Sequence, residues 1–293
     1  MRRYLESHGL IEPQMVEPYW PRTRDRNVPV FIDTSTGLKF VDDESDNLHY
    51  YETRAVVDDG ITSNTPSIER PIEGTTLSDA QRRAKQYANL LKGKTICDFG
   101  AGHGGFIRNI LSFAGNISAV EVNKYFLDML RPLEAKGVKV FQDISDVDTD
   151  VDVMTCFHVL EHLTDPIEKL QQMHAKLRQR GTIIVEVPHA RDFLMQTMDL
   201  DEFKSFVLQS AHLVLHTRET LTKMIKAAGF PEVTVHGYQR YGIANHLFWL
   251  RNRKPGGHEI WADLDAEPVN EAYSALLKEI DQTDTLIAVA RKA

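Results

Sequence analysis

Hydrophobic residues between positions 95 and 187 fall into short runs separated by amphipathic stretches. The runs predict strands at Thr95–Phe99, Ile117–Val122, Val138–Phe141, Val151–Phe157 and Thr182–Val187. Apolar positions at helical spacing predict helices between them, at 104–114, 124–136 and 165–179. Strands that alternate with helices are parallel, because the chain must cross back over the sheet between them. The pattern therefore predicts an α/β fold with helices on both faces of a mostly parallel sheet.

The same alternation continues toward the C-terminus. It predicts a helix at Thr217–Ala228, a strand at Val233–Tyr238, a helix near 268–281 and a strand at Asp284–Ala290. Gly229 follows the first of these helices and suits a left-handed C-cap. Upstream, a helix is predicted from a serine cap at Ser78 to about Leu91.

Residues 1–77 lack this alternation and are predicted to form an N-terminal extension. Two β-rich runs, at 28–33 and 38–41, flank a short turn that ends in Gly37 and predict a hairpin. We therefore expect an extension at 1–77 and a main α/β domain at 78–293.

Composition narrows the class of protein. A chain of 293 residues with 42% hydrophobic residues can bury a large core. It has no apolar run of about 18 residues and no apolar segment behind Arg2 and Arg3, so neither a membrane span nor a signal peptide is predicted. Cys97 and Cys156 lie in predicted strands without metal-ligand spacing, which is typical of free thiols in a reducing compartment. We expect a cytoplasmic protein that has no membrane partner.

The net charge bears on the partner. A formal charge of −8 argues against a broad nucleic-acid surface, because such surfaces are basic. A small molecule is therefore the expected partner. Nothing in the sequence decides between a monomer and a homo-oligomer.

The most informative segment is the glycine-rich turn at 98–105, D-F-G-A-G-H-G-G, which follows the first predicted strand. Glycines there let backbone N–H groups approach a ligand that a Cβ would block. Two spacings fit: G-x-G-x-x-G through Gly100, Gly102 and Gly105, and D-x-G-x-G-x-G through Asp98, Gly100, Gly102 and Gly104. Asp98 would repel a pyrophosphate but attract the ammonium of a methionine moiety. The turn therefore favours S-adenosylmethionine over a dinucleotide, and a tight turn without a ligand is the alternative.

Two further acids follow strand ends. Glu121 lies about 20 residues beyond the glycines, where a carboxylate accepts hydrogen bonds from ribose hydroxyls. Asp143 follows the third strand and is a candidate acceptor for the adenine amino group. For each, an ordinary solvated acid is the alternative.

Together, D-F-G-A-G-H-G at 98–104, Glu121, Gln142-Asp143 and F-H-V-L-E-H-L-T-D-P at 157–166 resemble class I S-adenosylmethionine-dependent methyltransferases over residues 78–293. The resemblance implies a Rossmann-like seven-stranded sheet of order 3-2-1-4-5-7-6. It implies S-adenosylmethionine as cofactor and S-adenosylhomocysteine as product. The cofactor-binding residues that it implies are Asp98, Gly100, Ala101, Gly102, Gly104, Glu121, Val122, Asp143, Ile144, Phe157 and His158.

A looser resemblance concerns the acceptor. The chain is similar to the branch of sugar C-methyltransferases and ubiquinone-pathway O-methyltransferases. This implies a small-molecule acceptor such as a nucleotide-linked sugar or a cell-surface glycan precursor. Two alternatives stay open: an NAD-dependent oxidoreductase that uses the same glycines, and a non-catalytic module that binds S-adenosylmethionine.

A histidine-rich segment follows the fourth strand. If a helix starts there, His158, Glu161 and His162 share one face, and two imidazoles with a carboxylate can ligate a divalent metal. We expect instead that these residues shape the methionine pocket and that no metal is tightly bound. A further ligand would have to come from His189, His212 or His216.

Methyl transfer to a hydroxyl requires a group that removes its proton, and histidine suits that task. His158 and His162 follow the fourth strand and His189 follows the fifth, at the sheet edge where α/β sites form. His189 is the first candidate, and a purely structural histidine is the alternative. The aromatic and polar segment at 237–250 is predicted to be either a wall of the acceptor site or core.

Overall fold

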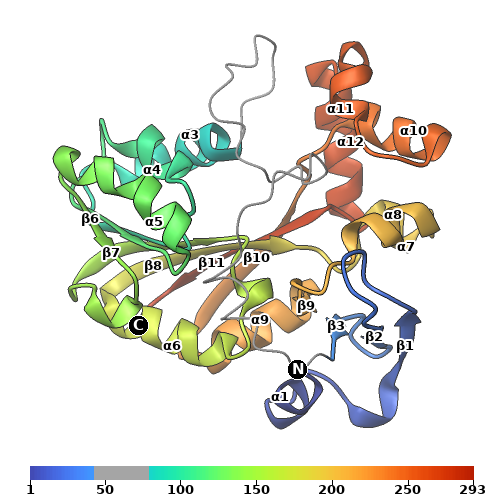
Figure 1. Ribbon diagram of the computed structural model, residues 1–293, viewed down its shortest axis with the longest axis horizontal. Coiled ribbons are helices and arrows are strands. Elements are labelled where there is room, and N and C mark those ends of the chain that lie inside the picture. Colours follow the sequence, from blue (N-terminus) through green and yellow to red (C-terminus); the bar gives the residue numbers. More distant parts are fainter. Residues whose placement is uncertain (43–78) are drawn as a thin grey trace. The chain divides into compact units, whose positions relative to one another are not determined.

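The computed structural model describes residues 1–42 and 79–293 (Figure 1). The predicted helix cap at Ser78 and the predicted boundary between residues 77 and 78 lie outside these residues. Contacts divide the described chain into two units. The first unit holds residues 1–42, His158–Leu170 and Val185–Ala290, and the second holds residues 79–157, Gln171–Ile184 and Arg291–Ala293.

The larger sheet has seven strands in the order β10-β11-β8-β7-β4-β5-β6. Its strands are β4 (Ile96–Phe99), β5 (Ile117–Val120), β6 (Val138–Phe141), β7 (Val151–Phe157), β8 (Leu177–Pro188), β10 (Glu232–Tyr238) and β11 (Thr285–Arg291). β4 pairs in parallel with β5 and with β7, and β5 pairs in parallel with β6. Counted along the chain, these strands follow the order 3-2-1-4-5-7-6, so the predicted sheet order is confirmed.

The β8 strand begins five residues before the predicted start at Thr182. Near the start of this strand, Arg178, Gln179 and Arg180 are exposed, whereas the residues from Gly181 to Val187 are buried. Hydrophobic runs mark only the buried part of a strand, while the backbone ladder can continue into solvent. The sequence therefore located the core of this strand and missed its exposed start.

Among the helices next to β4 and β5, the first ends at Leu91 as predicted, the one predicted at 104–114 is shorter, and the one predicted at 124–136 is divided into an α-helix and a 3₁₀ helix. They are α3 (Asp79–Leu91), α4 (Gly105–Ile110), α5 (Lys124–Leu130) and the 3₁₀ helix η2 (Arg131–Lys136). In the second unit, α3, α4 and α5 lie over the same side of the strands (Figure 1). The Asn123 side chain caps α5 by accepting the backbone N–H groups of Tyr125 and Phe126. The α-helix changes to 3₁₀ geometry at Pro132, which has no N–H for a helical hydrogen bond.

The smaller sheet belongs to the first unit and has the order β1-β2-β3-β9. Its strands are β1 (Val16–Trp20), β2 (Val30–Asp33), β3 (Lys39–Val41) and β9 (Val214–Leu215). The predicted hairpin is confirmed as the antiparallel pair β2 and β3. On its other edge β3 pairs with β9, with Phe40 opposite Val214. The described N-terminal residues thus share a sheet with a strand from the second half of the chain.

The described chain contains further helical segments. They are α1 (Arg2–Ser7), η1 (Pro13–Met15), η3 (Ile144–Asp146), η4 (Leu160–His162), α6 (Pro166–Lys176), α7 (Phe193–Gln196), α8 (Asp201–Val207), α9 (Arg218–Ala227), α10 (Ile243–Asn252), α11 (Gly257–Ile260), η5 (Ala262–Leu264) and α12 (Glu267–Glu279). The α10 helix lies in the segment predicted as either wall or core, and its Phe248 and Trp249 are buried. In the described parts of the chain, no helix combines the length and the apolar character that crossing a bilayer requires.

Candidate functional site

The glycine-rich turn connects β4 to α4 in a left-handed backbone conformation. The φ angles of Gly100, Gly102 and Gly104 are 77°, 53° and 80°. A Cβ on Gly104 would lie 2.8 Å from Leu130 Cδ2, whereas a Cβ on Gly102 would meet no atom within 4 Å. Gly104 is therefore required by packing, and Gly102 borders open space. The left-handed glycines belong to the D-x-G-x-G-x-G spacing, the one predicted for S-adenosylmethionine.

Asp98 is the penultimate residue of β4 and is only 3% exposed. It lies opposite Thr155 of β7, whose Oγ1 donates a hydrogen bond of 2.7 Å to Asp98 Oδ1. Burial raises the pKa of Asp98 to about 6, against the hydrogen bond from Thr155 and the charge of Arg83. The ionised carboxylate is thus held at a free-energy cost that a cationic ligand would relieve.

Glu121 directly follows β5 and is 8% exposed, so the solvated-acid alternative is wrong. Its Oε2 accepts the backbone N–H of Gly102 at 2.8 Å, and its Oε1 accepts that of Asn123 at 2.8 Å. Burial raises the pKa of Glu121, although both backbone hydrogen bonds oppose the rise. Each carboxylate oxygen has a second lone pair, so Glu121 can fix the glycine turn and accept ligand hydroxyls together.

Phe157, at the end of β7, is surrounded by side chains from two helices. Its ring centroid lies 6.4 Å from that of Tyr87 on α3 and 5.1 Å from that of Phe106 on α4. The Arg83 guanidinium lies 4.6 Å from the Phe157 ring centroid. The same guanidinium lowers the pKa of Asp98 by its charge. A cation therefore lies over this aromatic ring and close enough to Asp98 to interact with its carboxylate.

The other predicted cofactor residues differ in their surroundings. Ala101 and Ile144 are buried, and Val122 is half-buried. Asp143 is exposed, and its Oδ1 accepts the backbone N–H of Ser145 to cap η3. The second unit thus brings Asp98, the glycines and Phe157 to the carboxyl ends of adjacent strands, with Asp143 at the end of β6.

In the first unit, His158 begins a cluster of buried polar groups. Its φ of 55° is rare for a residue with a side chain and is a form of strain that concentrates at functional sites. Its Nδ1 lies 3.2 Å from Glu161 Oε1, and its Nε2 lies 3.5 Å from Glu186 Oε1. Burial lowers the pKa of His158, but the contacts with both carboxylates outweigh it, so the pKa is raised.

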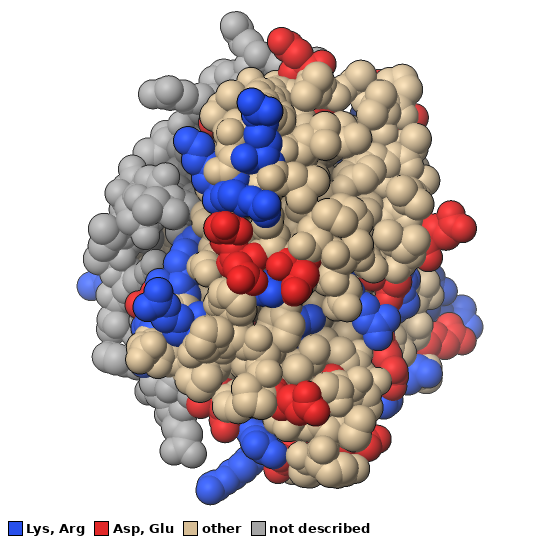
Figure 2. All heavy atoms as spheres, turned by 90° about the vertical axis from the view of Figure 1, so that its right-hand side faces the viewer, with Lys and Arg blue, Asp and Glu red and all other residues tan. Residues whose placement is uncertain are grey.

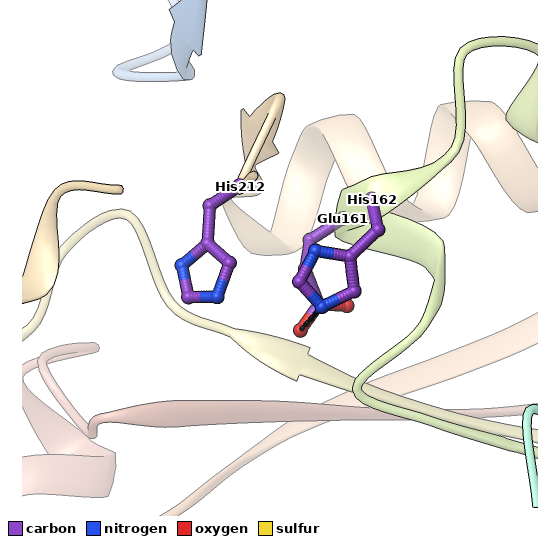
Figure 3. A group of neighbouring side chains, drawn as sticks. All are labelled: Glu161, His162 and His212. Carbon is purple, nitrogen blue, oxygen red and sulfur yellow. Dashed lines mark ion pairs between the residues drawn. The ribbon is translucent and has the colours of Figure 1, made fainter. Parts of the chain in front are cut away.

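Glu161, His162 and His212 form a second group in the same unit, and Figure 3 shows their side chains turned toward one another. One ligand atom from each lies within 4.8 Å of those of the other two. The first two residues come from η4, and His212 comes from the segment before β9. The backbone N–H of Leu213 donates to the Glu161 carbonyl at 2.7 Å and joins these two segments.

His189 and His216 are not members of that group. They form an isolated parallel bridge and are 1% and 0% exposed. His189 Nδ1 lies 2.9 Å from the Thr283 carbonyl, and His216 Nδ1 lies 3.3 Å from Thr220 Oγ1. Burial lowers the pKa of each histidine to about 4, so both imidazoles are neutral at pH 7.

Sequence reasoning did not single out Thr155 or Arg83. Thr155 could have been found by aligning the predicted strands, because it lies in register with Asp98. Arg83 carries no such signal, since α3 contains several basic residues. The proximity of His212 to Glu161 depends on how distant segments pack.

Comparisons with known proteins identify the family of the chain. Residues 75–235 match a family described as "Methyltransferase domain". A ubiquinone biosynthesis O-methyltransferase of Actinobacillus pleuropneumoniae is 30% identical over 112 residues, which cover 34% of this chain and 47% of that protein. A tRNA U34 carboxymethyltransferase of Campylobacter lari is 26% identical over 117 residues, covering 37% of this chain and 40% of that protein. The chain thus matches less than half the length of either curated relative.

Solved structures share the fold. An S-adenosylmethionine-dependent methyltransferase of Archaeoglobus fulgidus has a TM-score of 0.51 at 21% identity, over 72% of this chain and 92% of that one. Phosphoethanolamine N-methyltransferase 2 of Haemonchus contortus, in complex with S-adenosylmethionine, has a TM-score of 0.52 at 14% identity. That match covers 87% of this chain and 61% of the other.

Proposed function

The chain belongs to the methyltransferase family and uses S-adenosylmethionine, and from this premise we propose that it methylates a small molecule. When bound, the cofactor supplies a methyl group on a sulfonium that leaves as a neutral thioether. The observation that carries the proposal is the buried carboxylate of Asp98 beside the left-handed glycine turn. We assign residues 78–293 to the methyltransferase domain and residues 1–77 to the extension.

Asp98 is proposed to bind the ammonium of the methionine moiety. A buried carboxylate whose pKa is raised is stabilised when a cation approaches it. The hydrogen bond from Thr155 orients the Asp98 carboxylate. A pyrophosphate beside Asp98 and Glu121 would meet two carboxylates, which disfavours the dinucleotide alternative. Gly100, Ala101, Gly102 and Gly104 supply the backbone around the cofactor.

Arg83 is proposed to bind the carboxylate of the same moiety. A methionine tail carries both charges, so its binding site needs a cation close to Asp98. The Arg83 guanidinium meets that need beside Phe157, and a planar guanidinium matches the geometry of a carboxylate. His158, the next residue after Phe157, is the remaining candidate for contact with this end of the cofactor.

The nucleoside end is assigned to the neighbouring strand ends. Glu121, with Val122 beside it, is proposed to accept hydrogen bonds from the ribose hydroxyls through the lone pairs that the backbone does not use. Asp143 is proposed to accept the adenine amino group, and Ile144 to contact the base.

The test of this assignment compares S-adenosylmethionine with its decarboxylated analogue by calorimetry. Arg83→Gln should weaken binding of the intact cofactor about 10- to 100-fold, because a charged hydrogen bond is lost. It should change the affinity for the decarboxylated analogue little, since that ligand has no group for Arg83 to bind. Arg82→Gln, one residue earlier on α3, is the control and should bind both ligands normally.

Equal losses for both ligands would show that Arg83 acts on the fold and not on the carboxylate. Tight binding of NAD without any binding of S-adenosylmethionine would reject the whole assignment.

A small acceptor fits the charge of the chain better than RNA does. The formal charge is −8, and Figure 2 shows acidic and basic side chains intermixed on the face that it displays. The resemblance to sugar-modifying enzymes favours a nucleotide-linked sugar or a glycan precursor. We would screen nucleotide sugars, dihydroxybenzoates and a tRNA transcript for release of S-adenosylhomocysteine. Release with none of them would favour the non-catalytic alternative, and release with the tRNA alone would overturn the small acceptor.

His189 is proposed as the base, with His158 and His162 as further groups on the acceptor side. If His189 Nδ1–H donates to the Thr283 carbonyl, its Nε2 keeps the lone pair that a base requires. His189→Ala should retain cofactor affinity and lower turnover about 100-fold or more. His236→Ala, at an exposed position of β10, is the control. Full turnover of His189→Ala would reject the role.

A further inference from the structure

We propose that Glu161, His162 and His212 bind one divalent transition-metal ion. The two imidazoles and the carboxylate converge from two segments, with one ligand atom from each within 4.8 Å of the others (Figure 3). Two histidines and one carboxylate are a recognised donor set for Zn²⁺, Mn²⁺ and Fe²⁺. This site does not depend on the proposed cofactor contacts, which lie on other residues.

The hydrogen bonding of His162 supports this reading. Its Nδ1 lies 2.8 Å from the carbonyl oxygen of Ala211, an acceptor, so Nδ1 carries the proton. The lone pair is then on Nε2, which lies 3.9 Å from Glu161 Oε1. Metal-binding histidines characteristically donate their other ring N–H to a carbonyl or a carboxylate in this way.

Buried atoms in the group lack partners. Among the residues that the structure describes, Glu161 Oε2 and His212 Nδ1 are buried and make no hydrogen bond. Glu161 itself is 1% exposed, and the interaction with His158 engages its other oxygen, Oε1. An unpartnered carboxylate oxygen inside a protein is strongly unfavourable. A cation bound between Glu161 and the two histidines would give the buried carboxylate of Glu161 a partner of opposite charge.

One of the three proposed ligands, His212, also borders a cavity. His212 lines a small cavity together with Lys39, Phe40 and Leu215 of the smaller sheet. Three protein ligands leave coordination positions for water or for an oxygen of a bound molecule. In a methyltransferase such an ion would lower the pKa of an acceptor hydroxyl, and this last step alone rests on the proposed function.

A metal at this site differs from the expectation in the sequence analysis that no metal is tightly bound. The metal alternative there used His158, Glu161 and His162 on one face of a helix, but the segment forms a 3₁₀ turn and His158 contacts two carboxylates instead. The third ligand is His212, from a segment far along the chain, one of the three further candidates that the sequence named.

The test is direct metal binding by the full-length chain. The protein is stripped with a chelator and titrated by calorimetry with Zn²⁺, Mn²⁺ and Mg²⁺. We expect one Zn²⁺ or Mn²⁺ per chain and much weaker binding of Mg²⁺, because imidazole ligands favour transition metals. His212→Ala and Glu161→Gln should each weaken binding by more than about 100-fold, and His174→Ala on α6 should not.

Electron paramagnetic resonance of the Mn²⁺ form should show coupling to imidazole nitrogen, and this coupling should decrease in His212→Ala. Cofactor affinity of each variant, measured without metal, reports whether it has folded and separates this proposal from the proposed function. The site would be overturned if the stripped chain takes up neither Zn²⁺ nor Mn²⁺, or if folded variants bind them unchanged.

Discussion

Asp98 is an ionisable residue that is buried near the end of β4. A pKa raised from 3.8 to about 6 means that the ionised form costs about 3 kcal/mol in the folded chain. The Thr155 hydrogen bond offsets only part of the burial. A group that lowers stability in this way is typical of a binding site, where the ligand supplies the missing charge.

Replacing Asp98 should therefore separate stability from binding. Asp98→Asn should increase the free energy of unfolding at pH 7 by up to about 3 kcal/mol, because the amide keeps the Thr155 hydrogen bond without a buried charge. The same variant should bind S-adenosylmethionine at least about 10-fold more weakly. Urea unfolding of the ligand-free protein and calorimetry measure the two effects. Asp128→Asn, at an exposed position, is the control, and a destabilised Asp98→Asn would contradict the argument.

A lower pH, which protonates Asp98, should likewise change both the stability of the fold and the affinity for the cofactor. Its pKa is raised in the folded state, so its contribution to stability is complete below pH about 4 and is lost as the pH rises through about 6. Affinity for a cationic tail changes in the opposite sense, since the protonated acid does not attract it. Cofactor association constants measured between pH 5 and pH 8 should decrease below pH about 6. Asp98→Asn should lack this dependence, and a wild-type affinity independent of pH would contradict it.

The residues of the cofactor site differ in how far the sequence predicts them. Asp98 and the glycines lie in one continuous segment, so their spacing alone indicates their chemistry. Thr155 requires knowledge of strand register, and Arg83 requires the packing of α3. Contacts between segments that are distant in sequence depend on tertiary geometry, which single-sequence patterns do not contain.

At the scale of elements, the alternation of strands and helices predicts the seven-stranded sheet because each unit is long and periodic. The smaller sheet is predicted only as a hairpin. β9 has two residues, and β1 contains Pro18, which is unfavourable in a strand pattern. The aromatics of α10 left wall and core as alternatives, and the burial of Phe248 and Trp249 agrees with core.

The contact between the glycine turn and α5 gives a prediction about packing. A Cβ on Gly104 would lie 2.8 Å from Leu130 Cδ2 and 3.1 Å from Leu133 Cδ1. Gly104→Ala should therefore lower the free energy of unfolding by about 2–4 kcal/mol, through a strained φ and overpacking together. Gly137→Ala is the matched control, because its φ is 86° and its Cβ would meet nothing within 4 Å.

We expect the control to lose only about 1–2 kcal/mol, from backbone strain alone. Unfolding in urea compares the two variants. Equal losses would mean that contact with α5 is not the reason for a glycine at position 104.

At the scale of the whole molecule, segments far apart in sequence form one contact unit. The N-terminal hairpin shares a sheet with β9, and Phe40 is 1% exposed at that junction. Sequence patterns could not predict this pairing, since the extension is apart from the α/β alternation. The described residues 1–42 are therefore part of the packing of the first unit.

Phe40→Ala tests that dependence. It should lower the free energy of unfolding by about 3–5 kcal/mol, as expected for a large side chain removed from a core. Amide hydrogen exchange at Val214 and Leu215 should accelerate, because their strand pairs with β3. Phe31→Ala, at the half-buried partner position on β2, should have a smaller effect on both measurements. Unchanged exchange in β9 would show that the hairpin does not stabilise it.

Glu121 fastens the glycine turn to the start of α5 through two backbone amides, with no ligand needed. The turn is thus preorganised, and the proposed contacts go to the amino-acid tail and the nucleoside, which substrate and demethylated product share. Such an arrangement discriminates poorly between the two. Product inhibition should therefore be strong and competitive, and sustained turnover in a cell would depend on a separate reaction that removes S-adenosylhomocysteine.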